Sequence, residues 1–253
     1  MDPTMKAALA EYLIAMADDE LILAHRDSEW TGHAPILEED IAFTNISLDE
    51  IGHATLWYQL AAELLGEDPK TYPDQLAFLR EAEAYRCAQI VELPKGDWGF
   101  SILRQYLFDT FEGLHLTELA QSRHAALAQA AAKVQKEEQY HLRHTEAWVR
   151  RLGSGTAESQ NRMQEALDTL WPHALQVVEA RPGEAELDGV APGWEALREA
   201  WLAQVVAFLT EAGLAVPEGR EAANREREKH SEHLPKVLVE MQKVARMGRG
   251  ARW

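Results

Sequence analysis

Apolar residues recur along most of this chain at alternating spacings of three and four, which places them on one face of an α-helix. Four stretches keep this repeat over many turns, at about residues 4–28, 35–65, 98–126 and 128–152. Shorter helices are predicted at about residues 73–92, 157–180, 192–213 and 218–247. Glycine and proline cluster between these stretches, and no segment keeps a strand-like alternation long enough to build a sheet. The pattern therefore predicts an all-α fold.

Each of the four long stretches carries acidic or histidine side chains inside its apolar face rather than beside it. The first and third contribute one Glu each, and the second and fourth contribute a Glu-x-x-His pair: Glu20, Glu50, His53, Glu112, Glu138 and His141. An ionised carboxylate on a core face is costly to desolvate unless it is paired, protonated or bound to a cation. Within a Glu-x-x-His pair, positions i and i+3 share a helix face, so both side chains can bind the same ion.

This arrangement is the ligand pattern of di-iron and di-manganese carboxylate proteins with ferritin-like bundles. Oxygen and imidazole ligands suit iron or manganese, so we expect two iron ions per chain, with manganese as the alternative. Composition alone predicts about one Glu-x-x-His, and the sequence has three. The interpretation therefore rests on chain order and on the apolar setting. The alternative is that these residues are ordinary polar groups satisfied in the core or on the surface.

The third Glu-x-x-His, Glu112-Gly-Leu-His115, adds a histidine that the ligand pattern does not need. His115 is either a further member of the site or a core histidine. Asp109 lies one helical turn before Glu112 and either orients a ligand histidine or faces solvent.

We expect one ferritin-like domain over residues 1–253, with the core bundle at about 4–152 and peripheral helices at about 157–247. The stretch from residue 66 to residue 97 is long enough for the crossover between the second and third helices of such a bundle.

The net charge of -17 disfavours binding to nucleic acid or to an anionic membrane surface. No apolar run reaches the length of a membrane span, and the first residues lack the features of a signal peptide, so we expect a cytoplasmic protein. The single cysteine, Cys87, excludes a disulfide within the chain and is expected to be a buried thiol. His230 and His233 lie in a charged run that is typical of a solvated helix face.

Several motifs resemble the C subunits of phenylacetyl-CoA epoxidase, the PaaC family. They span nearly the whole chain: Glu29-Trp30-Thr31-Gly32-His33-Ala34-Pro35, Tyr140-His141-Leu142-Arg143, Arg151-Leu152-Gly153-Ser154-Gly155-Thr156, Leu170-Trp171 and His230-Ser231-Glu232-His233-Leu234. The resemblance implies a ferritin-like subunit of a multicomponent monooxygenase for aerobic phenylacetate breakdown. In that system a related A subunit holds the di-iron site that epoxidises the ring of phenylacetyl-CoA, and the C subunit pairs with A in a structural role.

This chain departs from the family in one respect, because familiar C subunits have lost most of the metal ligands and this chain has all six. Three functions follow as alternatives. The first is a di-iron monooxygenase component with phenylacetyl-CoA as the substrate of the complex. The second is a scaffold that docks the A-type subunit and other epoxidase components, with a homodimer also compatible. The third is another ferritin-like protein, for iron storage or manganese catalase chemistry.

Overall fold

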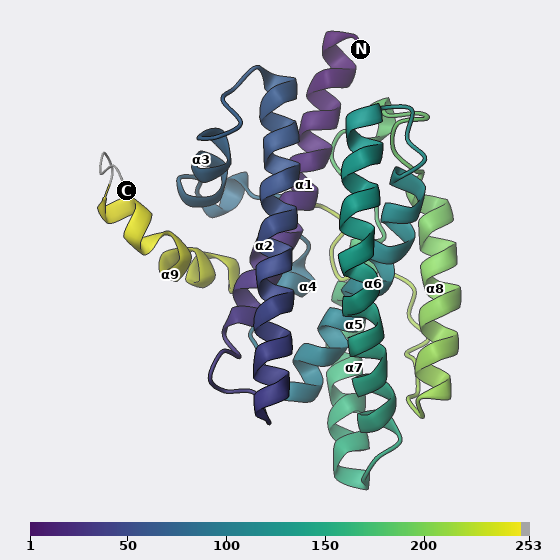
Figure 1. Ribbon diagram of the computed structural model, residues 1–253. Coiled ribbons are helices and arrows are strands. Elements are labelled where there is room, and N and C mark those ends of the chain that lie inside the picture. Colours follow the sequence, from purple (N-terminus) through teal and green to yellow (C-terminus); the bar gives the residue numbers. More distant parts are fainter. Residues whose placement is uncertain (249–253) are drawn as a thin grey trace. The chain divides into compact units, whose positions relative to one another are not determined.

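Helices form the regular secondary structure of this protein in the computed structural model, which describes residues 1–248 (Figure 1). The predicted all-α class is confirmed, and the long helices are consistent with a ferritin-like bundle. In the described residues the extended pairing is limited to an isolated bridge between Asp188 and Ala191. None of the helices in this range combines the length and apolarity needed to cross a bilayer.

The described chain forms two compact units that are nested in the sequence. Unit 1 comprises residues 1–94, residues 181–187 and, within the described chain, residues 226–248. Unit 2 comprises residues 95–180 and 188–225. The prediction that residues 1–253 form one domain stays a prediction.

Unit 1 is built on two long helices, α1 (Pro3–Ser28) and α2 (Leu37–Leu65), which pack along each other. Its shorter elements are α3 (Tyr72–Phe78), the 3₁₀ helix η1 (Ala82–Ala84), α4 (Gln89–Glu92), the 3₁₀ helix η2 (Glu184–Glu186) and α9 (Leu234–Met247). Both α4 and η2 pack against α1, and α9 packs against α3. The Asp2 side chain caps α1 by accepting a hydrogen bond from the Met5 N–H, and Gly66 ends α2 in the left-handed conformation.

Unit 2 is centred on α5 (Trp98–Leu119), which is buried along most of its length. Three further helices pack on α5, namely α6 (Ala125–Gly153), α7 (Ala157–Val177) and α8 (Trp194–Glu211) (Figure 1). Asp97 and Thr156 cap α5 and α7 by accepting hydrogen bonds from backbone N–H groups in the first turn. Of the helices from residue 157 onward, α7 and α8 therefore pack on α5.

The prediction of a continuous helix over 73–92 is wrong, because this segment breaks into α3, η1 and α4. The helix breaks where two backbone N–H groups donate hydrogen bonds to acidic side chains of α1 instead of to helix carbonyls. The Arg86 N–H donates to Asp18 at 2.7 Å, and the Ala88 N–H donates to Asp19 at 2.6 Å. These donors are lost to a helical ladder, so tertiary hydrogen bonds override the local helix propensity.

The predicted helix over 218–247 is also wrong in its first half, since α9 begins only at Leu234. The Ser231 N–H donates to a Glu92 carboxylate oxygen at 2.6 Å, and the Arg227 side chain pairs with Asp19. The preceding stretch is therefore an irregular segment held by unit 1. The third long helix ends at Leu119 rather than near residue 126, where Ser122 turns to donate to the Val190 carbonyl at 2.6 Å.

Candidate metal centre

Three of the six predicted ligands converge inside unit 1. Glu20 on α1 and Glu50 and His53 on α2 are all buried, and their ligand atoms lie within 4.8 Å of one another. His53 Nδ1 is 3.3 Å from Glu20 Oε2 and 3.8 Å from Glu50 Oε2. One imidazole nitrogen thus faces carboxylates from two helices, as expected of side chains that share an ion.

A tryptophan fixes the orientation of the Glu20 carboxylate. Trp57 lies one turn after His53 on α2, and its indole N–H donates to Glu20 Oε1 at 3.2 Å. This bond occupies one carboxylate oxygen and leaves the other directed at His53. Support of a ligand by a neighbouring hydrogen bond is typical of metal sites.

Unit 2 contains the other three predicted ligands. Glu138 and His141 of α6 lie side by side, with His141 Nδ1 3.0 Å from Glu138 Oε1, and both are buried. Glu112 is buried on α5, the helix against which α6 packs. The predicted placement of all six residues on core faces is therefore confirmed, whereas their joint binding of metal stays a prediction.

Two residues with open roles are also buried in unit 2. Asp109 is fully buried, which excludes the solvent-facing alternative. Its two oxygens accept hydrogen bonds from Gln105 Nε2 at 2.7 Å and from Thr145 Oγ1 at 2.8 Å, so Asp109 links α5 to α6. His115 is buried with its ring centroid 5.0 Å from that of Phe111.

Sequence reasoning missed two acidic residues beside Glu20. Asp18 and Asp19 are fully buried, so three consecutive acids of α1 lie in the interior. Asp18 accepts from Arg80 and from the Tyr58 hydroxyl, the latter at 2.5 Å. Burial and the neighbouring Asp18 carboxylate raise the pKa of Tyr58 well above its ordinary value. The run Asp-Asp-Glu within an apolar helix was the available signal.

Asp19 is held by two arginines from distant parts of the sequence. Arg227 Nη1 donates to its two oxygens at 2.7 and 2.8 Å, and Arg181 Nη2 lies 3.4 Å away. Both guanidinium groups are buried with it. The two aspartates are thus neutralised by arginine and belong to the scaffold around Glu20 rather than to the ligand set.

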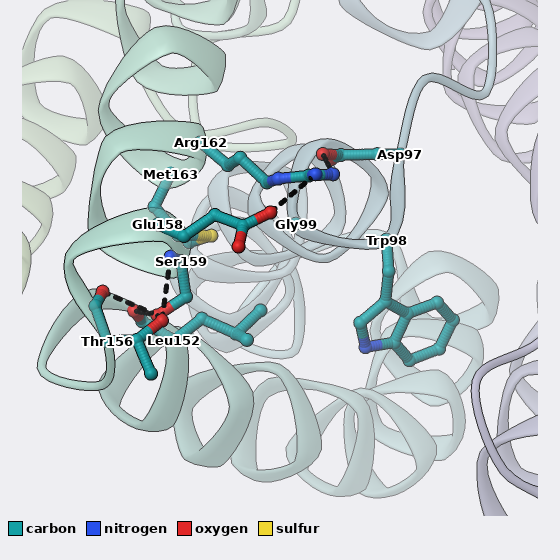
Figure 2. A pocket seen from close by; sticks show the side chains of 9 residues that line it. All are labelled: Asp97, Trp98, Gly99, Leu152, Thr156, Glu158, Ser159, Arg162 and Met163. Atoms are coloured by element: carbon teal, nitrogen blue, oxygen red, sulfur yellow. Dashed lines mark hydrogen bonds and ion pairs between the residues drawn. The ribbon is translucent and has the colours of Figure 1, made fainter.

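A separate cavity of about 260 Å³ lies in unit 2 between the starts of α5 and α7 (Figure 2). Arg162 lies at this cavity and bridges two carboxylates, 3.4 Å from Asp97 and 2.7 Å from Glu158. Figure 2 shows Trp98 and Met163 among its lining side chains. The lining residues include none of the six predicted ligands, so the cavity does not belong to the predicted metal centre.

The donor chemistry in unit 1 fits iron or manganese. Carboxylate oxygens and an imidazole nitrogen, with no thiolate, are the donors that these ions take in proteins. Glu20, Glu50 and His53 offer such donors within one buried cluster. A cation there would balance the carboxylate charge that burial otherwise makes costly.

Comparison with known proteins identifies the family of this chain. The model of the family described as phenylacetic acid catabolic protein matches residues 1–253. The chain is also similar to the C subunit of the 1,2-phenylacetyl-CoA epoxidase of Escherichia coli (strain K12). The two are 40% identical over 250 residues, which covers 97% of this chain and 99% of the relative. This chain therefore belongs to the phenylacetic acid catabolic protein family.

Proposed function

We propose that this chain is the C subunit of a multicomponent phenylacetyl-CoA epoxidase of aerobic phenylacetate catabolism, and that it carries two iron ions. The first part is supported by the similarity to the Escherichia coli relative over nearly the full length of both chains. The second part is carried by one observation, the convergence of Glu20, Glu50 and His53 in a buried cluster. Manganese is the alternative ion.

In this proposal the ligand set repeats the order of one Glu followed by one Glu-x-x-His along the chain: Glu20, Glu50 and His53, then Glu112, Glu138 and His141. Bound iron with ligands of this kind supplies the activation of O2 for insertion of oxygen into an organic substrate. The acidic residues supply negative charge, and the two histidines supply neutral nitrogen donors.

The surrounding residues hold these ligands in place and keep water out. The Trp57 N–H fixes one oxygen of Glu20 and turns the other toward His53. In unit 2, Gln105 and Thr145 hold the buried Asp109 one turn before Glu112. All six ligand side chains are at most 3% exposed, so the protein excludes bulk solvent from the ions.

The proposed partner is an A-type catalytic subunit, together with other components of the epoxidase, in the cytoplasm. An exposed apolar stripe on α2 supports a docking role, because Leu37, Ile41, Leu48 and Ile51 recur on one face of the helix and are 71%, 55%, 60% and 42% exposed. The same stripe favours the second candidate function, a scaffold that docks the catalytic subunit and turns over no substrate itself.

Metal analysis of the purified chain after anaerobic iron loading tests the iron site. We expect two iron ions per chain in the wild type, and loss of iron from Glu50→Ala and from Glu138→Ala. Glu63→Ala removes an exposed carboxylate of the same helix as Glu50 and should retain the iron. Iron content well below two per wild-type chain would contradict the site.

Turnover in the reconstituted complex separates the two functions. If Glu50→Ala and Glu138→Ala lose iron and the complex loses phenylacetyl-CoA epoxidation, the ions take part in catalysis. Full turnover with both variants would favour the scaffold. Failure of the chain to associate with an A-type subunit would contradict both functions.

A further inference from the structure

A second cluster of metal-binding side chains lies in unit 1, apart from the six predicted ligands. Cys87, Glu92 and His230 offer a sulfur, an oxygen and a nitrogen within 4.8 Å of one another. Glu92 Oε1 lies at the centre, 2.6 Å from His230 Nδ1 and 3.6 Å from Cys87 Sγ. Cys87 and Glu92 are fully buried, and the side chain of His230 is 8% exposed. The expectation that His230 lies on a solvated helix face is therefore wrong, and that of a buried Cys87 is confirmed.

The hydrogen bonds of His230 fix which of its nitrogens faces the cluster. Nε2 lies 3.1 Å from the Tyr85 carbonyl oxygen, which can only accept, so Nε2 carries a hydrogen. In the neutral ring Nδ1 then carries a lone pair, which is directed at Glu92 Oε1. Two acceptors at 2.6 Å need a proton or a cation between them. Donation of the remote N–H to a backbone carbonyl is also how metal-bound histidines are usually oriented.

The carboxylate of Glu92 is held in a matching way. Its other oxygen, Oε2, accepts the Ser231 N–H at 2.6 Å, so Oε1 is the oxygen left for the cluster. The backbone carbonyl of Glu92 accepts from the Arg26 guanidinium at 2.6 and 3.2 Å, which anchors the end of α4 to α1. The ligand atoms are thus directed by hydrogen bonds from outside the cluster.

Distances and charges match a small divalent ion. Tetrahedral coordination with ordinary zinc bond lengths places S and O about 3.5 Å apart, and N and O about 3.3 Å apart. The observed S–O distance of 3.6 Å already matches, and the N–O pair would widen when an ion replaced the shared proton. Thiolate and carboxylate together balance a charge of two.

We propose that Cys87, Glu92 and His230 bind a divalent ion of the zinc class, with water in the fourth position at the exposed edge of His230. Binding displaces two protons, one from the Cys87 thiol and one from between His230 and Glu92. No electron transfer is involved. The ion would tie the segment before α9 to α4, and this site is independent of the proposed iron ligands.

The state of Cys87 without metal is consistent with this exchange. Burial, followed by the nearby Glu92 carboxylate, raises the pKa of the thiol. The side chain is therefore a neutral thiol until a cation is present, and a coordinating metal deprotonates it outright.

Titration of the full chain with Co²⁺ tests the site, because a thiolate bound to Co²⁺ gives a charge-transfer absorption band that oxygen and nitrogen ligands do not give. Cys87 is the only cysteine, so the band reports on this residue alone. We expect the band in the wild type, its displacement by Zn²⁺, and its absence in Cys87→Ser. His230→Gln should weaken Co²⁺ affinity at least tenfold.

His233→Gln is the matched control, since it changes a histidine of the same segment that is not in the cluster, and it should retain the wild-type affinity. Circular dichroism shows whether each variant is folded. If Cys87→Ser does not fold, the presence of the band in the wild type and the Co²⁺ affinity of His230→Gln still test the site. Absence of the band from the folded wild type, or equal affinity of His230→Gln, would leave a proton-bridged His230–Glu92 pair and overturn the proposal.

Discussion

Three neighbouring acidic residues of α1 have three different partners. Asp18 contacts Arg80 and Tyr58, Asp19 contacts Arg227 and Arg181, and Glu20 faces His53. Successive helical residues point about 100° apart, so each acid meets a different neighbour. Position along the helix therefore decides which carboxylate is neutralised by arginine and which is directed at a histidine.

The buried Tyr58 makes stability depend on pH in the alkaline range. Its pKa is raised in the folded state above the ordinary value of 10.0. Below pH 10 the hydroxyl is protonated in both states, and above it the unfolded chain loses the proton first, so stability falls by up to about 1.4 kcal/mol per pH unit. We expect Tyr58→Phe to flatten the fall in unfolding free energy above pH 10, measured by urea denaturation. The exposed Tyr140→Phe serves as the control, and identical slopes in both variants would contradict the assignment.

Arg227 should be a large contributor to stability. Its guanidinium is 1% exposed and pairs with the fully buried Asp19. Arg227→Met leaves Asp19 with the more distant Arg181 and should lower the unfolding free energy by about 3–5 kcal/mol. Lys229→Met breaks an exposed ion pair with Glu226 and should change the unfolding free energy by less than about 1 kcal/mol. Equal losses in the two variants, measured by denaturant titration, would show that the Asp19 pair contributes no more than a surface pair.

At the scale of elements, long helices were predictable and irregular segments were not. α1, α2 and α6 have repeats that extend over many turns, so local periodicity decides their bounds to within a few residues. The segments around Arg86 and Ser231 were predicted as helix, because their composition favours helix. Their backbone donors instead bind carboxylates far away in the sequence. The local sequence pattern does not predict hydrogen-bond partners that are distant in the sequence.

The candidate sites also contain residues that the sequence pattern predicts and residues that it does not. The burial of the six proposed ligands was predictable, since each lies within an apolar repeat. Cys87 and His230 were not predictable as a pair, because 143 positions separate them in the sequence (230 − 87) and no local spacing links the two residues. Asp19 gave a partial signal as a buried acid, whereas its partner Arg227 lies in a charged run that is typical of an exposed surface.

The turn before η2 should be sensitive to a single methyl group. Gly183 has a φ of +78°, and a Cβ there would lie 2.2 Å from the Ala8 carbonyl oxygen of α1. Gly183→Ala therefore combines backbone strain with a backbone clash. Gly66→Ala, at a φ of +77° with open space around it, has only the strain, about 1–2 kcal/mol. We expect Gly183→Ala to lower the free energy of unfolding, measured by urea denaturation, by more than about 1 kcal/mol beyond the loss caused by Gly66→Ala. Equal losses would contradict close packing of this turn on α1.

At the scale of the whole molecule, the proposed binding of iron by all six ligands should raise thermal stability. Iron at 100 times its dissociation constant adds about 2.7 kcal/mol, which corresponds to a rise in Tm of roughly 5–10 °C for a chain of this size. Glu50→Ala in unit 1 and Glu138→Ala in unit 2 should each abolish the rise, whereas Glu63→Ala should keep it. Calorimetry with and without a chelator measures this. A rise in Tm that survives either ligand variant would contradict a ligand set made of all six residues.

The nesting of the two units has a consequence for synthesis on the ribosome. Asp19 emerges early, but Arg181 and Arg227 follow only after most of unit 2 has been made. During synthesis the Asp19 carboxylate therefore lacks its arginine partners, and unit 1 can be completed only when the segment that begins at residue 226 has been made. A nascent chain that stops before residue 227 would expose an unfinished unit 1 to chaperones and proteases.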